Sequence, residues 1–437
     1  MQALGFRWSI PRFAFAKLGG ALWRGAFTHP FGPVGLLEVP EPGPPGPGWA
    51  TVDVRVAGIC GSDVKQVHLD GDADNPLTAV MSFPHVMGHE VTGTLAAAGE
   101  GVGRARRGER VVAFPWLACP ARGLEPCPAC RDGRPNHCRS FRRGALAPGM
   151  HLGTCRDAGG GFAPRLAVHD SMLFPVPDAV TDAQAALVDP CAVSLHALLR
   201  APPAPGDTVL VVGCGALGLL LVHLIDRLFP DVEVLAADVH PHLEPVARGL
   251  GAARYLARGG AALVEAVAEH RSAEVLRPYG GLPWLLEGVD RVYDTVGLAS
   301  TLEVGVRVLR PRGTLVLVGV AAPRRFEWTP LYMKELVLTG ASGSCVEAWE
   351  GARVHGFQLV LDLTAAGRID PARIATHAFP LARWREAFAV AADKRGARSL
   401  KVLLELAPGA AGLPLVAPTA GPADGSAAGR GAGPGLP

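Results

Sequence analysis

The chain has 437 residues, enough for two ordinary domains, and its formal net charge is only +2. Hydrophobic residues make up 49% of it and charged residues 19%, a balance typical of a globular protein. The sequence offers neither a broad basic surface nor a polyacidic tail, which excludes an extensive nucleic-acid interface.

The N-terminal residues MQALGFRWSIPRFAFAKLGG do not resemble a secretory signal, because Pro11, Lys17 and other polar positions interrupt every apolar run. We interpret them as a first strand pair. The longest apolar stretch, ALGLLLVHLI, covers about half a membrane span. We therefore expect no membrane association and a cytoplasmic location. Cysteines stay reduced there, and clustered thiols favour metal over disulfide.

The residue pattern changes three times along the chain. Up to about residue 190, short strands are separated by Gly and Pro turns. From 191 to 340, apolar strands alternate with helical segments, which predicts an α/β fold with a doubly wound parallel sheet of the Rossmann type. Residues 341–406 return to mixed strand and helix. Residues 407–437 contain few large apolar side chains, which predicts a disordered tail.

A glycine-rich turn lies between a predicted strand and helix in VLVVGCGALGLLL. Glycines let the backbone approach a pyrophosphate, and the helix N-terminus supplies free amides and a favourable dipole. Asp238 closes the next strand, where a carboxylate accepts from a ribose 2′-hydroxyl and repels a 2′-phosphate. NAD is therefore expected, with NADP left open by His240 and His242. The expected cofactor contacts are Gly213, Gly215, Ala216, Leu217, Gly218, Asp238 and Val318.

Two short motifs in the first half, GICGSD and GHE, contain metal-binding side chains. The thiolate of Cys60 and the imidazole of His89 suit zinc, and a catalytic zinc needs a third ligand and an open position. Either residue alone would be an ordinary core residue. Together with a dinucleotide fold, they favour a zinc-dependent oxidoreductase.

On these motifs the chain resembles the zinc-dependent medium-chain alcohol dehydrogenases. The resemblance covers roughly residues 1–406 and rests, in the family's order, on GICGSD, PHVMGHE, the cysteine lobe (residues 119–138), VDPCAVSLHA, VVGCGALG and KELVLTGASG. It implies a mainly β, GroES-like catalytic domain formed by residues 1–190 and 341–406 around a Rossmann domain at 191–340. It also implies a small-molecule alcohol substrate, NAD, two zinc ions per chain and a homo-oligomer, either a dimer or a tetramer.

The resemblance implies the ligands of the catalytic zinc. Cys60 and His89 look like direct ligands, and Glu90 resembles a carboxylate beside them that can enter the coordination sphere. The third ligand of the family usually opens the motif that reads DPCAVSLHA here, so Asp189 takes that place. Cys191 lies two residues further on and is a rival, and Glu90 or water is a further alternative.

Two residues correspond to the family's proton path. Ser62 stands where the family has a hydroxyl that passes the alcohol proton onward, although it could also be a plain turn residue. Lys65 stands where many relatives have a relay histidine, which leaves the exit of the proton open.

The stretch CPARGLEPCPACRDGRPNHC holds four cysteines in twenty residues. Three of them have the spacing of the family's structural zinc ligands, but the usual fourth place, three residues before Cys127, holds Leu124. We expect Cys119 to replace it through a loop that folds back, with His137 and Cys155 as weaker candidates. A lobe without metal is the alternative. The expected ligands are Cys119, Cys127, Cys130 and Cys138.

The function expected is reversible hydride transfer between an alcohol (a polyol, a sugar or a secondary alcohol) and NAD. Two alternatives stay open. A zinc-independent quinone or enoyl reductase of the same fold would lack the set Cys60, His89 and Asp189, and a non-catalytic NAD- and zinc-binding sensor would keep it without turnover. The segment EHRSAEVLRPYGGLPWLLEG suggests no role.

Overall fold

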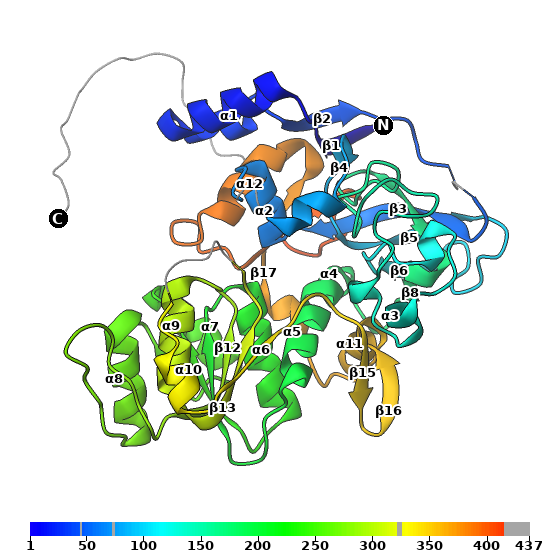
Figure 1. Cartoon of the computed structure of the whole chain (residues 1–437). Coiled ribbons are helices and arrows are strands. Elements are labelled where there is room, and N and C mark those ends of the chain that lie inside the picture. Colours follow the sequence, from blue (N-terminus) through cyan, green and yellow to red (C-terminus); the bar gives the residue numbers. More distant parts are fainter. Residues whose placement is uncertain (44–45, 72–74, 321–325, 415–437) are drawn as a thin grey trace.

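The computed structural model describes residues 1–43, 46–71, 75–320 and 326–414. The chain folds into two bodies with a parallel sheet in one and a mainly antiparallel sheet in the other. Both ends of the described chain belong to the antiparallel body, where the blue and the orange to red segments of Figure 1 lie together. The expected α/β architecture, with a Rossmann part and a separate mainly β part, is confirmed.

The antiparallel body contains a seven-stranded sheet with the order β17-β18-β3-β5-β6-β8, in which β7 also pairs with β3. β18 pairs with β3 through Leu403 opposite Gly58, so the C-terminal segment completes a sheet begun near the N-terminus. The alternating valines of β3, such as Val52, Val54 and Val56, are buried in its core. The strands are β3 Trp49–Gly58, β5 Glu90–Ala98, β6 Arg110–Ala113, β7 Arg165–His169, β8 Leu173–Pro175, β17 Ala375–Pro380 and β18 Lys401–Glu405.

The N-terminal twenty residues form one strand and a helix, so the predicted strand pair there is wrong. β1 (Gln2–Phe6) pairs with β2 (Val34–Glu38) and β4 (His85–Val86), and α1 (Ile10–Leu22) intervenes. The helix starts with a proline in its first turn, where proline is tolerated, and its middle contains the good helix formers Ala16, Lys17 and Leu18 before Gly19 and Gly20. Its outer face is apolar, because Ile10, Leu18 and Leu22 are 75%, 74% and 92% exposed.

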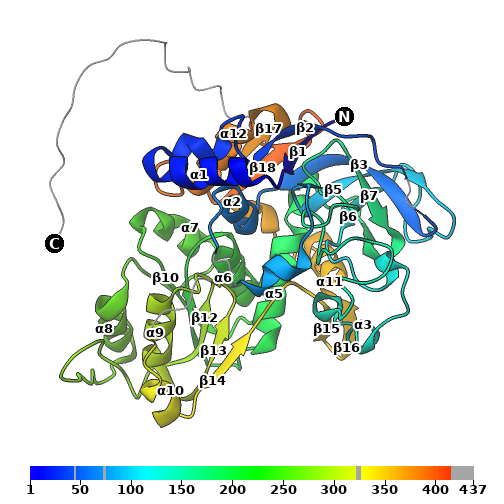
Figure 2. The same ribbon diagram turned by 45° about the horizontal axis from the view of Figure 1, so that its top comes forward.

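The parallel sheet has the order β11-β10-β9-β12-β13-β14, and every neighbouring pair is parallel. This is the 3-2-1-4-5-6 order of a dinucleotide-binding sheet, with its switch point between β9 and β12. Helices cover both faces (Figure 2): α6 and α7 share one buried cluster with the sheet, and α8 and α9 share the other. The elements are β9 Thr208–Val212, α6 Ala216–Leu228, β10 Glu233–Ala237, α7 Glu244–Gly249, β11 Arg254–Leu256, α8 Gly260–Arg271, β12 Val289–Asp294, α9 Ala299–Val308, β13 Leu309–Leu317, α10 Thr329–Met333 and β14 Val337–Gly340.

One helix crosses the predicted domain boundary at residue 190. α5 (Val188–Arg200) packs against α6 of the Rossmann part and against α11 (Gly356–Ala365), and α4 (Asp182–Ala186) precedes it. α5 thus contacts both parts, and the domain boundaries 1–190, 191–340 and 341–406 stay a prediction. The remaining described helices and strands are α2 Gly61–Val67, α3 Pro128–Arg131, β15 Val346–Trp349, β16 Ala352–His355 and α12 Trp384–Ala392.

The predicted tail begins inside the described residues. Ala411 is 2% exposed, and its amide donates to Glu405 at 2.8 Å, so residues 407–414 fold back onto the domain. The rest of the predicted tail, from residue 415 on, lies outside the described residues. None of the described helices has the length and the apolarity that a membrane crossing requires.

The segment between α8 and β12, to which the sequence assigned no role, is anchored by a buried lysine. Lys334 is 1% exposed, and its ammonium donates to the carbonyls of Leu285, Arg307 and Leu309. Leu285 itself is fully buried under the sheet. The segment is therefore part of the fold of the parallel body.

Candidate active site and metal centres

The predicted zinc ligands Cys60 and His89 lie together. Cys60 is the residue before the first turn of α2, and His89 and Glu90 lead into β5. The ligand atoms of these three side chains lie within 4.8 Å of one another. Asp63 fixes the turn, because its carboxylate accepts from the Cys60 amide at 2.9 Å. Thiolate, imidazole and carboxylate are the donors that zinc accepts, so this group fits the ion.

The electrostatics of this group favour a cation at its centre. Burial alone would lower the pKa of His89, but the charges of Asp63, Cys60 and Asp189 and a hydrogen bond with Cys60 raise it well above its ordinary value. Several acidic groups thus converge on one buried imidazole. In a metal-free protein a proton on His89 balances part of this negative charge, and a metal ion would take that place.

Asp189 and Cys191, the two rivals for the third ligand, sit in different surroundings at the start of α5. Burial raises the pKa of Asp189 to about 7, while the charge of His89 acts to lower it, so the two groups interact electrostatically. The pKa of Cys191 is raised to about 12 by burial alone, with no charged group contributing. Asp189 is nevertheless not one of the residues whose ligand atoms lie within 4.8 Å of both Cys60 and His89; Glu90 is.

Glu90 is held by a residue that sequence reasoning missed. Lys401, in β18, is 3% exposed and its ammonium donates to Glu90 Oε1 at 2.6 Å. Burial acts to lower the pKa of Lys401, but the charges of Glu90 and Cys60 raise it, so it stays a cation. A lysine between the apolar residues of SLKVLLEL was the available signal. Lys401 therefore gives Glu90 a cationic partner inside the metal group.

His151 is a second residue at the site that sequence reasoning missed. Its ring lies 4.9 Å from that of His89, centroid to centroid, and 5.9 Å from that of Trp116. Burial and the charge of His89 lower its pKa to about 3, so it stays neutral. Nothing in the surrounding stretch GMHLGT pointed to this position.

The two residues of the expected proton path both lie on α2. Ser62 is exposed in the first turn, one residue beyond Gly61. Lys65 reaches across to the parallel body, where its ammonium donates to the carbonyl of Val320 at 2.9 Å. Val320 follows β13, the strand that leads into the expected cofactor contact Val318. The helix that starts at the metal group thus touches the end of a cofactor strand.

The glycine-rich turn has the geometry that a dinucleotide loop requires. Gly213 has φ +91°, and a Cβ on Gly218 would come within 1.8 Å of the Gly213 carbonyl oxygen. Gly215 precedes the first turn of α6, which begins with Ala216 and Leu217. The close approach of strand and helix is therefore possible only with glycine at Gly218, as pyrophosphate binding at this helix N-terminus requires.

Asp238 lies just beyond β10, at the carboxyl edge of the sheet. Its Oδ2 accepts from the Cys214 amide at 2.8 Å, and its Oδ1 contacts the His240 ring at 2.7 Å. The loop after β12 is shaped in the same way by Asp294, which is fully buried and accepts from the amides of Val296 and Gly297. Both carboxylates border the switch point of the sheet, where dinucleotides bind in such folds.

The cysteine lobe brings its four predicted thiols together. Their sulfur atoms all lie within 4.8 Å of one another, with Cys119 3.5 Å from Cys138 and Cys127 3.7 Å from Cys130. None of them forms a disulfide. Cys119 returns to the group through the turn 120–122 and Gly123, which has φ +64°. The donors of this group, four thiols in a closed arrangement, are those of a structural zinc site.

Backbone amides in the lobe point at cysteine sulfur atoms and stabilise negative charge on them. The amide of Cys127 points to Cys119 Sγ at 3.4 Å, and that of Ser140 to Cys138 Sγ at 3.3 Å. Burial alone would raise the pKa of Cys127, but hydrogen bonds from the amides of Arg139 and Cys130 lower it to about 6. His137 and Cys155, the weaker candidates, are not members of the group of four.

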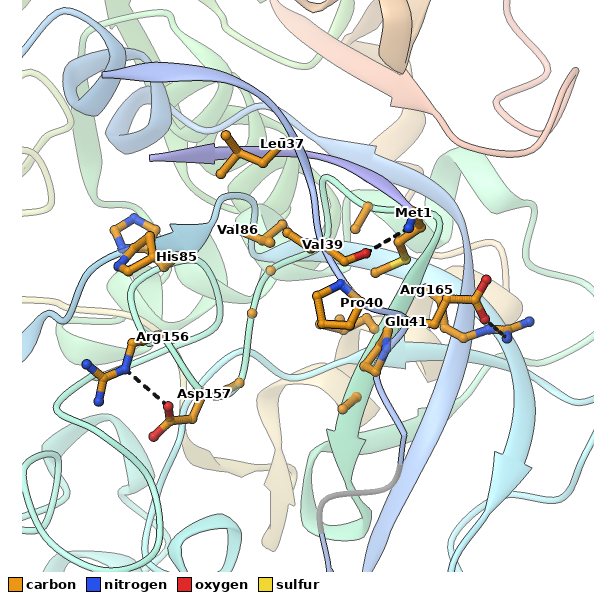
Figure 3. A pocket seen from close by; sticks show the side chains of 18 of the residues that line it. Met1, Leu37, Val39, Pro40, Glu41, His85, Val86, Arg156, Asp157 and Arg165 are labelled. Carbon is orange, nitrogen blue, oxygen red and sulfur yellow. Dashed lines mark hydrogen bonds and ion pairs between the residues drawn. The ribbon is translucent and has the colours of Figure 1, made fainter. Parts of the chain in front are cut away.

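A hollow of about 340 Å³ lies elsewhere, beside β1 and β4. Its lining contains many apolar side chains, with the ion pair of Arg156 and Asp157 at one end and Arg165 at the other (Figure 3). None of the predicted site residues lines it, and the lining residue nearest to His89 along the chain is Val86. This hollow is therefore separate from the metal group.

Comparison with known proteins places these features in one family. Residues 46–178 match the alcohol dehydrogenase GroES-like domain, and residues 216–355 match the zinc-binding dehydrogenase domain. L-Galactonate-5-dehydrogenase of Escherichia coli K12 is 30% identical over 346 residues, which cover 79% of this chain and 88% of that protein. L-Idonate 5-dehydrogenase of Vitis vinifera is 28% identical, over 83% of this chain and 89% of its own.

Solved structures show the same fold. The crystal structure of 2R,3R-butanediol dehydrogenase from Bacillus subtilis has a TM-score of 0.66 and 25% identity, covering 85% of this chain and 96% of its own. The alcohol dehydrogenase RspB of E. coli CFT073, complexed with NADH, has a TM-score of 0.70 and 24% identity, covering 93% and 99%. With its two domain matches, its motif order and its metal-binding group, this chain belongs to the zinc-dependent medium-chain alcohol dehydrogenase family.

Proposed function

We propose that this protein catalyses reversible, zinc-dependent hydride transfer between a secondary hydroxyl of a polyol or sugar acid and NAD. The observation that carries the proposal is the contact of Lys65 with Val320. It joins the helix that follows Cys60 to a residue beyond the end of β13, which supports a metal group near the cofactor edge of the sheet. The names of the relatives, which act on galactonate, idonate and butanediol, support a hydroxylated substrate.

The chain's own residues have distinct roles in this reaction. Cys60, His89 and Asp189 would hold zinc, which would supply a Lewis acid that makes a substrate hydroxyl more acidic. NAD supplies the hydride acceptor. Ser62, exposed two residues after Cys60, receives the hydroxyl proton and passes it to solvent.

The surrounding residues keep this arrangement in place. Asp63 orients the Cys60 backbone, and Lys401 donates a hydrogen bond to Glu90 beside the metal ligands. Asp238 accepts from the ribose and repels a 2′-phosphate, which favours NAD over NADP. A second zinc in the cysteine lobe, bound by its four thiolates, stabilises that lobe.

The test is a spectrophotometric assay at 340 nm with zinc-loaded protein. The substrates are sorbitol, xylitol, L-galactonate, L-idonate and 2,3-butanediol, with ethanol as the simple alcohol. We expect NAD reduction with at least one polyhydroxy compound and loss of activity with a chelator. Turnover of a quinone or an enoyl compound that survives chelation would instead support the zinc-independent reductase. Binding of NAD and zinc without any turnover would support the sensor.

We also propose that the protein is a cytoplasmic homo-oligomer, either a dimer or a tetramer. A small-molecule alcohol substrate requires neither a nucleic acid nor a membrane as a partner. Light scattering of the purified full chain measures the mass directly, and a monomer at micromolar concentration would contradict the proposal.

A further inference from the structure

A third group of metal-binding side chains lies outside both centres described above. His196 in α5 and Cys345 and Glu347 at β15 place their ligand atoms within 4.8 Å of one another. All three residues are buried, with at most 8% of their surface exposed. They come from the helix that joins the two bodies and from the strand that follows β14, about 150 residues apart in sequence.

The distances within this group resemble those of a tetrahedral metal site. Cys345 Sγ lies 3.7 Å from His196 Nδ1 and 3.5 Å from Glu347 Oε1. Zinc bonds of about 2.3 Å to sulfur and about 2.0–2.1 Å to nitrogen or oxygen put such ligand pairs about 3.6 Å apart. The third pair, His196 Nδ1 and Glu347 Oε1, is closer, at 2.7 Å, because a hydrogen bond joins it. A metal ion would replace that shared proton and widen the pair to about 3.3 Å.

The charges of the group also call for a cation. Glu347 is a buried carboxylate whose only ion-pair partner among the described residues is His196. A divalent ion with a neutral His196, a thiolate and a carboxylate has no net charge, which suits a buried site.

The group lies where the cysteine lobe meets the rest of the molecule. Val346 lies between Cys345 and Glu347, and its amide donates to the Gly133 carbonyl at 2.8 Å. The side-chain amide of Asn136 donates to the Ser342 carbonyl at 2.7 Å. A Cβ on Gly133 would come within 2.8 Å of Val346, so the two segments are in close contact.

We propose that His196, Cys345 and Glu347 bind a third zinc ion, which fastens α5 to β15 beneath the cysteine lobe. The donor set of one thiolate, one imidazole and one carboxylate leaves a fourth position for water. Because the site is buried, we assign the ion a structural role. It stabilises the segment against which the cysteine lobe packs and takes no part in hydride transfer.

The decisive variant is Glu347→Gln. Glutamine keeps an oxygen that accepts from the His196 ring, so a purely structural hydrogen bond would survive, whereas the charge needed to bind a metal ion is lost. The full-length protein, grown with zinc and desalted, is measured by elemental analysis and native mass spectrometry. We expect three zinc ions per chain in the wild type and two in Glu347→Gln, with a lower melting temperature.

Two further variants identify which ion is lost. Cys155→Ser removes another buried thiol outside the group and should keep three ions. Cys60→Ser should lose one ion, and the double variant Cys60→Ser/Glu347→Gln should lose two, which separates this site from the catalytic one even if the proposed activity is absent. Two ions in the wild type would overturn the inference, and so would three ions in both wild type and Glu347→Gln.

Discussion

The cysteine lobe and the Cys60–His89 centre both present thiols to a metal, but they are assembled in different ways. The lobe takes all four sulfurs from one stretch of twenty residues. The catalytic group takes Cys60 from the start of α2 and His89 from the start of β5, and Asp189 of α5 interacts with it electrostatically. A local site can form as soon as its loop closes, whereas the catalytic site exists only when the sheet and the domain junction are in place.

The two centres also differ in what surrounds their ligands. Backbone amides point at the lobe sulfurs and stabilise thiolates without adding a full charge. Around His89, the charged side chains Asp63 and Lys401 surround the ligands instead. Amides suit a closed site that holds one ion permanently, and ionised side chains suit an open site whose charge changes as substrate arrives.

The largest effect is expected for Cys60→Ser. It removes the only thiolate of the catalytic group, so one zinc should be lost and turnover should fall by at least about a thousandfold, the equivalent of several kcal/mol of Lewis-acid assistance. Elemental analysis and a kcat measurement check this together. The lobe should keep its zinc; release of both ions would show that the two centres do not form independently.

Asp189→Ala should have the next largest effect, because it removes the carboxylate that interacts electrostatically with His89. Catalytic zinc and activity should fall together, while Asp189→Asn should bind the metal more weakly than wild type without losing it. The matched variant Cys191→Ala should change little, since that thiol is buried away from charge. The reverse result, with zinc lost from Cys191→Ala and kept in Asp189→Ala, would give the third ligand to Cys191.

Ser62→Ala sharpens the comparison, because it leaves every metal ligand in place. Turnover should fall by about a hundredfold, the lower end of general acid–base contributions, with zinc content and NAD affinity unchanged. A pre-steady-state measurement with deuterated substrate shows whether hydride transfer limits the rate. If it does and turnover equals that of wild type, Ser62 is only a turn residue.

Cys119→Ser tests whether Cys119 is a zinc ligand of the lobe. If Cys119 is the displaced fourth ligand, about one zinc should be released and the stretch 119–138 should become sensitive to protease. Activity should fall less than in Cys60→Ser, because the lobe does not touch the reacting atoms. Full zinc retention together with protease resistance would argue for a lobe that needs no metal at Cys119.

The motif-bearing parts of the molecule could be predicted from the sequence, and the reason is that they are local. The lobe thiols, the turn from Gly213 to Gly218 and the position of Asp238 all follow from spacing within one loop or one strand–helix unit. The parallel sheet likewise follows from the alternation of strands and helices, which determines its layering.

What could not be predicted depends on side chains that meet only after folding. Lys401 approaches Glu90 from 311 residues away, and His151 reaches His89 from a loop without any recognisable motif. Helix α1 was missed because its exposed face is apolar, so its pattern did not separate a buried face from a solvated one. Such contacts carry no signal in the spacing of one sequence.

Substitution of Lys65 should have the smallest and most specific effect. Lys65 joins the two bodies and contacts none of the proposed metal ligands. Its hydrogen bond to the Val320 carbonyl is exposed to solvent, so we expect a net contribution of at most about 1 kcal/mol. Lys65→Met should therefore raise the KM for NAD about fivefold and leave zinc at both centres unchanged, and Lys65→Arg should restore most of the loss. A relay role predicts a different result: kcat would fall, its pH profile would shift, and the KM for NAD would stay the same. Steady-state kinetics over a pH series distinguishes the two. The result decides whether the catalytic centre, unlike the lobe, depends on a contact between domains.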